Sequence, residues 1–265
     1  MKRLFVEGVG LLGPGLDGWS ASRAVLAGKE AYLAAATNLH ASDMLPAAER
    51  RRAGVPIKLA LAVGQEAFMQ SGCDMKMAST VFTSSGGDND NVHAINGILA
   101  TAPREVSPTR FHNSVHNAAA GYWCIAAESR EPSTSLCAYD ASFAAGLLES
   151  ATQVSVEDAV VALIAYDHPY PQPLHAVRPI AAAFGMALIL TPRQSEKSLA
   201  AIEVGFASGK VQESVMQDAG LEALRSGVPA ARGLVLLQAL ASGKAAQVRI
   251  AYLEENHLDI RVTPC

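Results

Sequence analysis

Apolar runs rich in β-branched residues alternate with alanine-rich stretches from the N-terminus to about residue 166. Strands that are buried on both faces of a sheet have nearly continuous apolar sequences, and crossover helices between them cover the two faces. The alternation therefore predicts an α/β fold. Half of the 265 residues are hydrophobic and only 17% are charged, which is enough apolar material for one large core or two closely fused ones.

The same pattern locates the expected elements. Strands are predicted at residues 4–12, 79–84, 133–137, 158–166, 181–190, 200–207, 248–253 and 258–262. Helices are predicted at residues 19–26, 57–69, 141–148, 211–224 and 231–241, and another follows the polar loop at 84–90. Glu255 and Asn256 separate the last two strands and indicate a hairpin.

The charge balance and the cysteines argue against several classes of function. Lys and Arg number 21 against 25 Asp and Glu, so the net charge of −4 favours neither a nucleic acid nor an anionic membrane surface as a partner. No uninterrupted apolar run reaches the ~18 residues that a membrane span requires. The four cysteines, which form no CxxC pair, are Cys73, Cys124, Cys137 and Cys265. They suggest neither a disulfide framework nor a zinc site, and a reducing cytoplasm is the simplest location.

Two polar segments invite a ligand-binding interpretation. The loop at 84–90 is glycine-containing and precedes a helix, but it lacks the lysine of a P-loop, and a flexible turn is the simpler interpretation. His112 and His116 have helical i, i+4 spacing, but no glutamate between them completes a zinc-protease motif and no third ligand is evident. A hydrogen-bonded structural histidine is favoured at each position. We expect no metal and no cofactor.

Several local segments share their order and spacing with one known protein family. The opening VEGVGLLGPG at 6–15, then Trp19 and LAGK at 26–29, is similar to the strand, glycine-rich turn and helix that begin its members. The later segments are Ser107-Pro108, HNAAAG at 116–121 and REPS at 130–133. Together these segments resemble the β-ketoacyl synthases, and the resemblance covers most of residues 1–207.

The resemblance implies the thiolase-like fold of that family, in which two βαβαβαββ halves pack back to back. Residues 1–265 would form one thiolase-like domain, with a complete N-terminal half at 1–207 and a truncated C-terminal half at 208–265. The reduced second half is expected to leave apolar surface uncovered. We therefore expect the chain to depend on a partner for solubility.

The family's chemistry needs a cysteine at the tip of a strand-to-helix turn, where the helix dipole helps to stabilise a thiolate. Here that turn has the sequence LCAYD. Counting forward from Pro132 places the nucleophile slot at Asp140, and counting back from Gly146 places it at Ala138. Neither count reaches Cys137, so the resemblance implies a degenerate turn with no catalytic residue.

An active family member also needs two histidines from glycine-rich loops of the second half, which activate the extender and stabilise the enolate. Neither loop is present in this sequence. His168 and His175 lie in a proline-rich stretch and His257 lies near the terminal hairpin, so none matches a catalytic position. The resemblance therefore implies the loss of condensing activity.

What the resemblance implies instead is a silent subunit, a pseudoenzyme. Active synthases are dimers whose nucleophile strands pair across the two-fold axis, and in polyketide systems a silent homologue, the chain length factor, takes one place in the dimer. Short proteins of this kind are known from aryl-polyene clusters. The implied partner is a full-length β-ketoacyl synthase, with an acyl chain on acyl-carrier protein as an indirect partner. The implied interface residues are His112, His116, Asn117, Tyr122, Trp123, Ser133, Ser135 and Cys137.

By the same analogy, bulky side chains near this interface would limit the acyl tunnel, although an ordinary core role is the alternative for each. The candidates are Phe111, Tyr122, Trp123 and Phe143. Two other functions remain open. One is an active acyltransferase-like or ketosynthase-like enzyme with Cys137 as the nucleophile and a histidine such as His168 as the base. The other is a stand-alone module that binds acyl groups or acyl-carrier protein.

Overall fold

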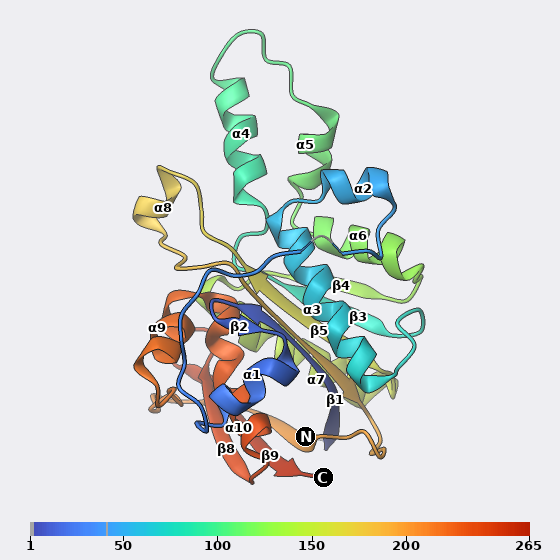
Figure 1. Ribbon diagram of the computed structural model, residues 1–265, viewed down its shortest axis with the longest axis vertical. Helices are drawn as coiled ribbons and strands as arrows, with labels where there is room; N and C mark the ends of the chain where they lie inside the picture. Colours follow the sequence, from blue (N-terminus) through green and yellow to red (C-terminus); the bar gives the residue numbers. More distant parts are fainter. Residues whose placement is uncertain (1–2, 41) are drawn as a thin grey trace.

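The computed structural model describes residues 3–40 and 42–265, and one mixed sheet of nine strands runs through it (Figure 1). The hydrogen-bonded order is β4-β3-β5-β6-β1-β7-β9-β8, and β2 pairs with β1. The strands are β1 (Leu4–Gly13), β2 (Leu16–Asp17), β3 (Ser79–Thr83), β4 (Ser133–Leu136), β5 (Val161–Asp167), β6 (Phe184–Thr191), β7 (Ala200–Ser208), β8 (Ala246–Ala251) and β9 (Asn256–Pro264).

Three neighbouring strands run parallel and end at the same edge of the sheet. β3 pairs in parallel with both β4 and β5, whereas β6 is antiparallel to β5 and to β1. Every residue of β1, β3, β5 and β6 is buried, as expected for strands that are covered on both faces. Successive side chains point to opposite faces, so Leu163 of β5 enters one core cluster and Ile164 enters the other.

Helices cover both faces of these strands and make this part of the molecule three layers deep. α3 and α6 contribute to the core cluster on one face, and α1, α7, α9 and α10 contribute to the cluster on the other. The helices are α1 (Trp19–Leu26), α2 (Ala47–Arg52), α3 (Val55–Ser71), α4 (Asn89–Leu99), α5 (Pro108–Asn113), α6 (Ala118–Ala127), α7 (Ser142–Glu157), α8 (Leu174–Val177), α9 (Ala219–Gly227) and α10 (Leu234–Ser242). The 3-10 helices are η1 (Tyr139–Ala141) and η2 (Pro229–Gly233). The predicted α/β fold is confirmed.

Glycines in β1 let α3 lie directly against the backbone of the strand. A Cβ atom on Gly10 would come 1.8 Å from the carbonyl oxygen of Val63, and one on Gly8 would come 2.0 Å from that of Ala67. Any side chain at these two positions would push the helix away from the strand. The glycines of the opening VEGVG run are therefore required by packing.

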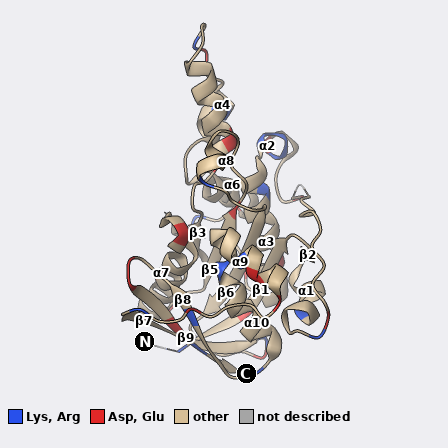
Figure 2. Ribbon diagram, turned by 90° about the vertical axis from the view of Figure 1, so that its left-hand side faces the viewer, with Lys and Arg blue, Asp and Glu red and all other residues tan. Residues whose placement is uncertain are grey.

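α4 and α5 form an arm that projects from the body of the molecule, as Figures 1 and 2 show. The arm leaves the body from the loop that follows β3. α4 has no buried residue, so tertiary packing contributes little to its stability. Asp88 caps the helix, because its side chain accepts a hydrogen bond from the backbone N–H of Asn91.

The predicted helix at 211–224 is wrong in its first half. Helix α9 begins only after Asp218, whose carboxylate accepts hydrogen bonds from the first turn of the helix. The residues before it have no regular secondary structure, and Ser214 exchanges two hydrogen bonds with Arg249 of β8. This tertiary contact has overridden the helical periodicity of the segment.

The two histidines with helical spacing do not share a helix. His112 lies in α5, whereas His116 lies in the turn between α5 and α6. The strand predicted at 181–190 begins later, at Phe184. The predicted terminal hairpin is confirmed as β8 and β9. Within the described ranges, the helices are too short or too polar for any one of them to cross a membrane.

Candidate functional site

The carboxyl ends of the three parallel strands bring polar loops together. The loops after β3, β4 and β5 begin at Ser84, Cys137 and His168. Loops at the same edge of a parallel sheet are neighbours, and this edge is where α/β folds usually place their sites. The Cys137 thiol donates a hydrogen bond to the Ser85 carbonyl at 3.2 Å, and the Tyr170 hydroxyl lies 3.3 Å from Ser85 Oγ. We call this region the carboxyl-edge site.

The turn between β4 and α7 has a strained residue at its tip. Tyr139 has a φ of 53°, in the left-handed region that residues other than glycine seldom adopt. The two sequence counts give Ala138 and Asp140 as the nucleophile slot, and Tyr139 lies between them. Sequence reasoning missed Tyr139 because residue type gives no indication of this backbone angle. The two disagreeing counts were the available signal.

Two arginines from distant segments cover the tip of this turn. The guanidinium carbon of Arg178 lies 3.5 Å from the centre of the Tyr139 ring, within cation–π distance. Arg178 Nη2 also forms an ion pair with Asp140 Oδ1 at 2.8 Å, and Arg232 Nη2 lies 3.7 Å from Asp140 Oδ2. Arg178 follows α8 and Arg232 lies in η2, so the turn is held by two separate parts of the chain.

Cys137 is exposed at the end of β4 and has no histidine partner. Its thiol donates to the Ser85 carbonyl, and among the described residues no imidazole hydrogen-bonds to it. Nε2 of the nearby His116 lies 3.1 Å from the Ser84 carbonyl instead. His168 is buried and makes its one ion-pair contact with Asp90. The arrangement supplies no base for a nucleophilic thiol.

A buried carboxylate connects the carboxyl-edge site to the C-terminal part of the chain. Asp167 accepts hydrogen bonds from the Ser85 N–H at 2.8 Å, from the Ser85 hydroxyl at 2.7 Å and from the Ser84 hydroxyl at 3.2 Å. It also accepts one from the Ala230 N–H of η2 at 2.9 Å. Burial raises the pKa of Asp167, and these hydrogen bonds work in the opposite direction. Asp167 therefore holds the loop after β3 against η2.

The residues implied as an interface fall into two groups. His112, Asn117, Ser133 and Cys137 are exposed, and His116 and Ser135 are partly exposed. These six lie on α5, on the turn after it, and on or just after β4. They are available to a partner.

Tyr122 and Trp123 are a correction to the implied interface. Their side chains are 1% and 0% exposed, so they cannot contact a partner in this conformation. The Trp123 ring stacks on Phe68 of α3 with centroids 5.6 Å apart. The Tyr122 hydroxyl donates to Asn113 Oδ1 at 3.1 Å. Both aromatic residues attach α6 to the rest of the subunit, because helix α6 turns this face toward the core.

The open edge of β4 offers unpaired backbone groups. β4 is the outermost strand, and within the described part of the chain it pairs only with β3. The carbonyls of Pro132 and Leu136 accept hydrogen bonds from β3. Backbone groups of alternate residues face the same neighbour, so those of Ser133 and Ser135 point to the open side. Such an edge is a template for another strand.

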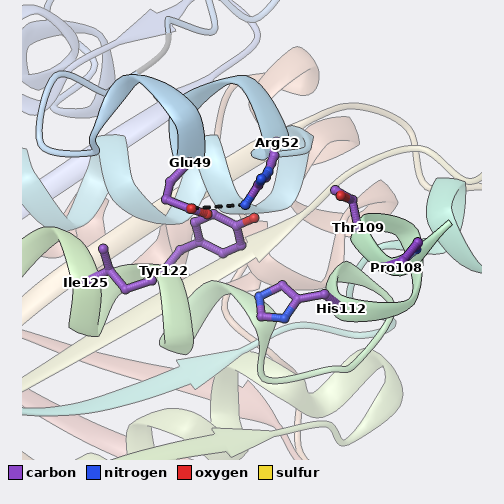
Figure 3. A pocket seen from close by; sticks show the side chains of 7 residues that line it. All are labelled: Glu49, Arg52, Pro108, Thr109, His112, Tyr122 and Ile125. Atoms are coloured by element: carbon purple, nitrogen blue, oxygen red, sulfur yellow. Dashed lines mark hydrogen bonds and ion pairs between the residues drawn. The ribbon is translucent and has the colours of Figure 1, made fainter.

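His112 also lines a cavity of about 450 Å³ beside this interface region (Figure 3). Glu49 and Arg52, both on α2, form an ion pair along one wall of it at 3.2 Å. The other lining residues come from α5 and α6 and are Pro108, Thr109, Tyr122 and Ile125. Neither Tyr139 nor Cys137 lines this cavity.

Comparisons with known proteins agree with this architecture. Residues 19–256 match the family described as β-ketoacyl synthase, N-terminal domain. None of the curated proteins matches the sequence.

Solved structures of ketosynthase complexes share the fold along the whole chain. A ketosynthase (ApeO) in complex with its chain length factor (ApeC) from Xenorhabdus doucetiae has a TM-score of 0.74 at 18% identity, covering 98% of this chain and 100% of that one. The ishigamide ketosynthase/chain length factor has a TM-score of 0.72 at 15% identity, covering 99% of both chains. A type II polyketide synthase acyl-carrier protein in complex with its ketosynthase (AntDE:AntF) has a TM-score of 0.76 at 12% identity, covering 100% and 99%. At such identities the likeness shows the fold, which is the thiolase-like fold of the ketosynthases.

Proposed function

The chain belongs to the β-ketoacyl synthase family, and from this membership we propose that it is a non-catalytic subunit of the chain-length-factor type. In this proposal it forms a heterodimer with a full-length, active β-ketoacyl synthase. The observation that carries the proposal is that a tyrosine, and not a cysteine, stands at the tip of the turn between β4 and α7. Tyr139 takes the strained position, with Arg178 packed on its ring.

A phenol at this position does not replace a cysteine thiolate. The Tyr139 ring faces the Arg178 guanidinium, and among the described residues no side-chain base hydrogen-bonds to its hydroxyl. Cys137 lies two residues before the tip, and its thiol donates a hydrogen bond to the Ser85 backbone carbonyl. These contacts favour a silent subunit over an enzyme that uses Cys137 with His168 as its base.

The open edge of β4 supports pairing with a partner strand. The outward backbone groups of Ser133 and Ser135 would continue the ladder into a second subunit. Exposed apolar side chains occur on the arm, in the turn after α5 and on α6. They are Val92 at 37%, Leu99 at 46%, Phe111 at 67%, Val115 at 48% and Ile125 at 48% exposed. Such a group of side chains is typical of a protein–protein interface.

Phe111 is the residue that we propose as the limit of an acyl tunnel. Trp123 and Phe143 are buried in the core of this chain, and Tyr122 is 1% exposed and only borders the cavity beside Arg52 and His112. Phe111 lies on α5 and is two-thirds exposed. A partner that covers the arm would bury its ring.

The finer parts of the proposal rest on the sequence resemblance and on the neighbouring complexes. We propose that the subunit takes part in polyketide-type or fatty-acid-type elongation, of the aryl-polyene kind, in the cytoplasm. Acyl-carrier protein would be its indirect partner, as the polyketide ketosynthase complex suggests. We retain the division into a synthase-like half at 1–207 and a reduced half at 208–265 as part of the proposal.

Co-expression with the ketosynthase encoded nearest to it tests this function. We expect a one-to-one complex in size-exclusion chromatography, and no decarboxylation of malonyl-carrier protein by the purified chain above a Cys137→Ala control. A monodisperse monomer in the presence of the ketosynthase would contradict the subunit proposal. Turnover that depends on Cys137 would contradict the proposal that the chain is non-catalytic.

Ser135→Pro and Ser135→Ala form a matched pair of variants. Proline removes the outward N–H group of β4 and leaves the ladder to β3 intact, whereas alanine keeps that N–H. We expect Ser135→Pro to abolish the complex and Ser135→Ala to preserve it, with both variants retaining the circular dichroism spectrum of the parent. Equal complex formation by the two variants would show that β4 does not pair with the partner.

A further inference from the structure

A group of three potential metal ligands lies where the arm joins the body. Asp88 caps α4, Asp90 lies in its first turn, and His168 follows β5. One ligand atom from each residue lies within 4.8 Å of the other two. We propose that these three residues bind a divalent transition-metal ion. This site goes beyond the proposed function and does not depend on it.

The spacing is close to that of a bound ion. Zinc bonds of ~2.1 Å in a tetrahedral site place neighbouring ligand atoms about 3.4 Å apart. His168 Nδ1 lies 3.8 Å from Asp90 Oδ2, so a small movement of the exposed Asp90 side chain closes this gap. The exposed side of the group leaves room for water ligands.

The burial of His168 points to a ligand. Its side chain is 3% exposed, and neither ring nitrogen hydrogen-bonds to a described residue. Burying an imidazole without partners costs free energy that a buried polar group normally avoids. Nε2 is the fully buried atom without a partner, and Nδ1 is the nitrogen that faces Asp90, so coordination through Nδ1 would give the ring one polar interaction.

The two carboxylates make no direct contact with a basic side chain. Asp88 and Asp90 line a cavity of about 510 Å³ together with four cationic side chains, Arg51, Arg52, Lys58 and Arg110. Figure 2 shows the basic segment at α2 beside the foot of the arm. Nevertheless, throughout the described part of the chain neither carboxylate forms an ion pair with an arginine or lysine, and Asp90 contacts only the imidazole of His168. The carboxylate oxygens are therefore not engaged by a cationic side chain and can coordinate a metal ion.

Asp88 is held in place for this role. Its two carboxylate oxygens accept hydrogen bonds from Asn91, one from the backbone N–H at 3.1 Å and one from the side-chain amide at 2.6 Å. Hydrogen bonds of this kind orient metal-binding carboxylates and leave further lone pairs for the ion.

The donor set indicates the class of metal. Two carboxylate oxygens and one imidazole nitrogen suit Zn²⁺ or Mn²⁺ better than Mg²⁺, which prefers oxygen ligands and dehydrates reluctantly. A bound ion would connect the loop after β3, the first turn of α4 and the loop after β5. It would therefore fasten the base of the arm to the carboxyl edge of the sheet.

Calorimetric titration of the chelator-treated full chain with ZnCl₂ and with MnCl₂ tests the site. We expect one ion per chain, and a Kd that rises roughly tenfold or more in Asp90→Asn. Asp90 is exposed, so this variant should fold normally. Asp43→Asn is the matched control, because Asp43 is exposed, pairs with Arg50 and is not part of the group of three ligands. It should bind as the parent does.

Two further readouts keep the test decisive. The visible spectrum of the Co²⁺ form should change in His168→Gln if the imidazole is a ligand, and hydrogen exchange in α4 should slow when Zn²⁺ is added. Absence of binding at millimolar metal, or equal affinity in the parent, Asp90→Asn and His168→Gln, would overturn the proposal.

Discussion

At the scale of single residues, Tyr139 combines strain with a specific contact. Its left-handed backbone costs free energy, while the ion pair of Arg178 with Asp140 and the stacking of Arg178 on the ring offset part of that cost. A residue kept in such a conformation is typical of a functional turn. In our proposal, Tyr139 stands at the nucleophile position of the family and supplies no thiolate there.

Replacing Tyr139 separates the strain from the contact. Tyr139→Ala and Tyr139→Gly both remove the contact with Arg178, but only glycine relieves the left-handed backbone. We expect Tyr139→Gly to be more stable than Tyr139→Ala by about 1 kcal/mol in urea unfolding. Equal stabilities would show that the backbone at this position is unstrained in solution.

Glu66 is a second residue of interest, because its surroundings change the pKa of its carboxyl group. Its carboxylate accepts hydrogen bonds from the N–H of Leu11 at 2.9 Å and of Trp19 at 2.6 Å, which joins α3 to the start of α1. Burial raises the pKa of Glu66 above the usual 4.5, although these hydrogen bonds lower it. The folded state therefore binds the proton of this group more tightly than the unfolded state does.

This raised pKa predicts the direction of a pH effect. The contribution of Glu66 to stability is fully present below its unfolded pKa of about 4.5, and it is lost as the pH rises through the higher folded pKa. The difference in unfolding free energy between the parent and Glu66→Gln should therefore shift against the parent as the pH rises through this range. Urea unfolding from pH 4 upward measures it. Parallel pH profiles for the two proteins would contradict the expectation.

At the scale of elements, the arm is notable because its long helix α4 has no buried residue. α4 buries none of its side chains, although Val92 and Leu99 are large and apolar. A helix without a buried face depends on its own propensity, and a helix of this length is marginal in water. The arm is therefore the part of the subunit that most needs a partner.

Hydrogen exchange measures this difference directly. We expect amides of α4 to exchange much faster than those of α3 in the isolated chain, because α3 packs on β1 and β6 with buried residues along its length, whereas α4 has none. In the complex with the ketosynthase, α4 should become protected. Unchanged exchange in α4 after complex formation would place the interface elsewhere.

At the scale of the whole molecule, one strand joins all the parts. β1 pairs with β6 on one side and with β7 on the other, so it connects the parallel strands to the C-terminal hairpin. α3 lies directly on β1 at Gly8 and Gly10. A disturbance there reaches both core clusters, because each contains residues of β1.

Gly10→Ala tests this central contact. The new methyl group would collide with the Val63 carbonyl, a backbone atom that cannot rotate away, and we expect a loss of about 3 kcal/mol in unfolding free energy. Gly97→Ala is the control, since nothing lies within 4 Å of a Cβ at this position of α4. It should be neutral or stabilising by up to ~1 kcal/mol. Similar stabilities for the two variants would contradict the close packing of α3 on β1.

Local patterns in the sequence account for most of the elements, and their limits are visible at particular places. The buried strands and α3 follow from continuous apolar runs and helical spacing, and β8 and β9 follow from the hairpin signal. The prediction of a helix at 211–224 was wrong in its first half because Ser214 hydrogen-bonds to Arg249 of β8, a contact between segments far apart in the chain. The sequence analysis placed Trp123 and Tyr122 at an interface because aromatic residues are common both in cores and at interfaces, and sequence alone does not distinguish the two. Both side chains are buried in the structure.

The sequence alone determined the fold class, the family and the absence of a cysteine at either counted position, because these depend on residue order and spacing. Only the tertiary structure decided which residue stands at the tip of the turn, since a left-handed backbone at Tyr139 is imposed by the strand and helix around it. It also decided which charges meet there, because Arg178 and Arg232 reach Asp140 from segments far along the chain. The grouping of Asp88, Asp90 and His168 has the same origin, because two parallel strands end side by side and bring their loops together.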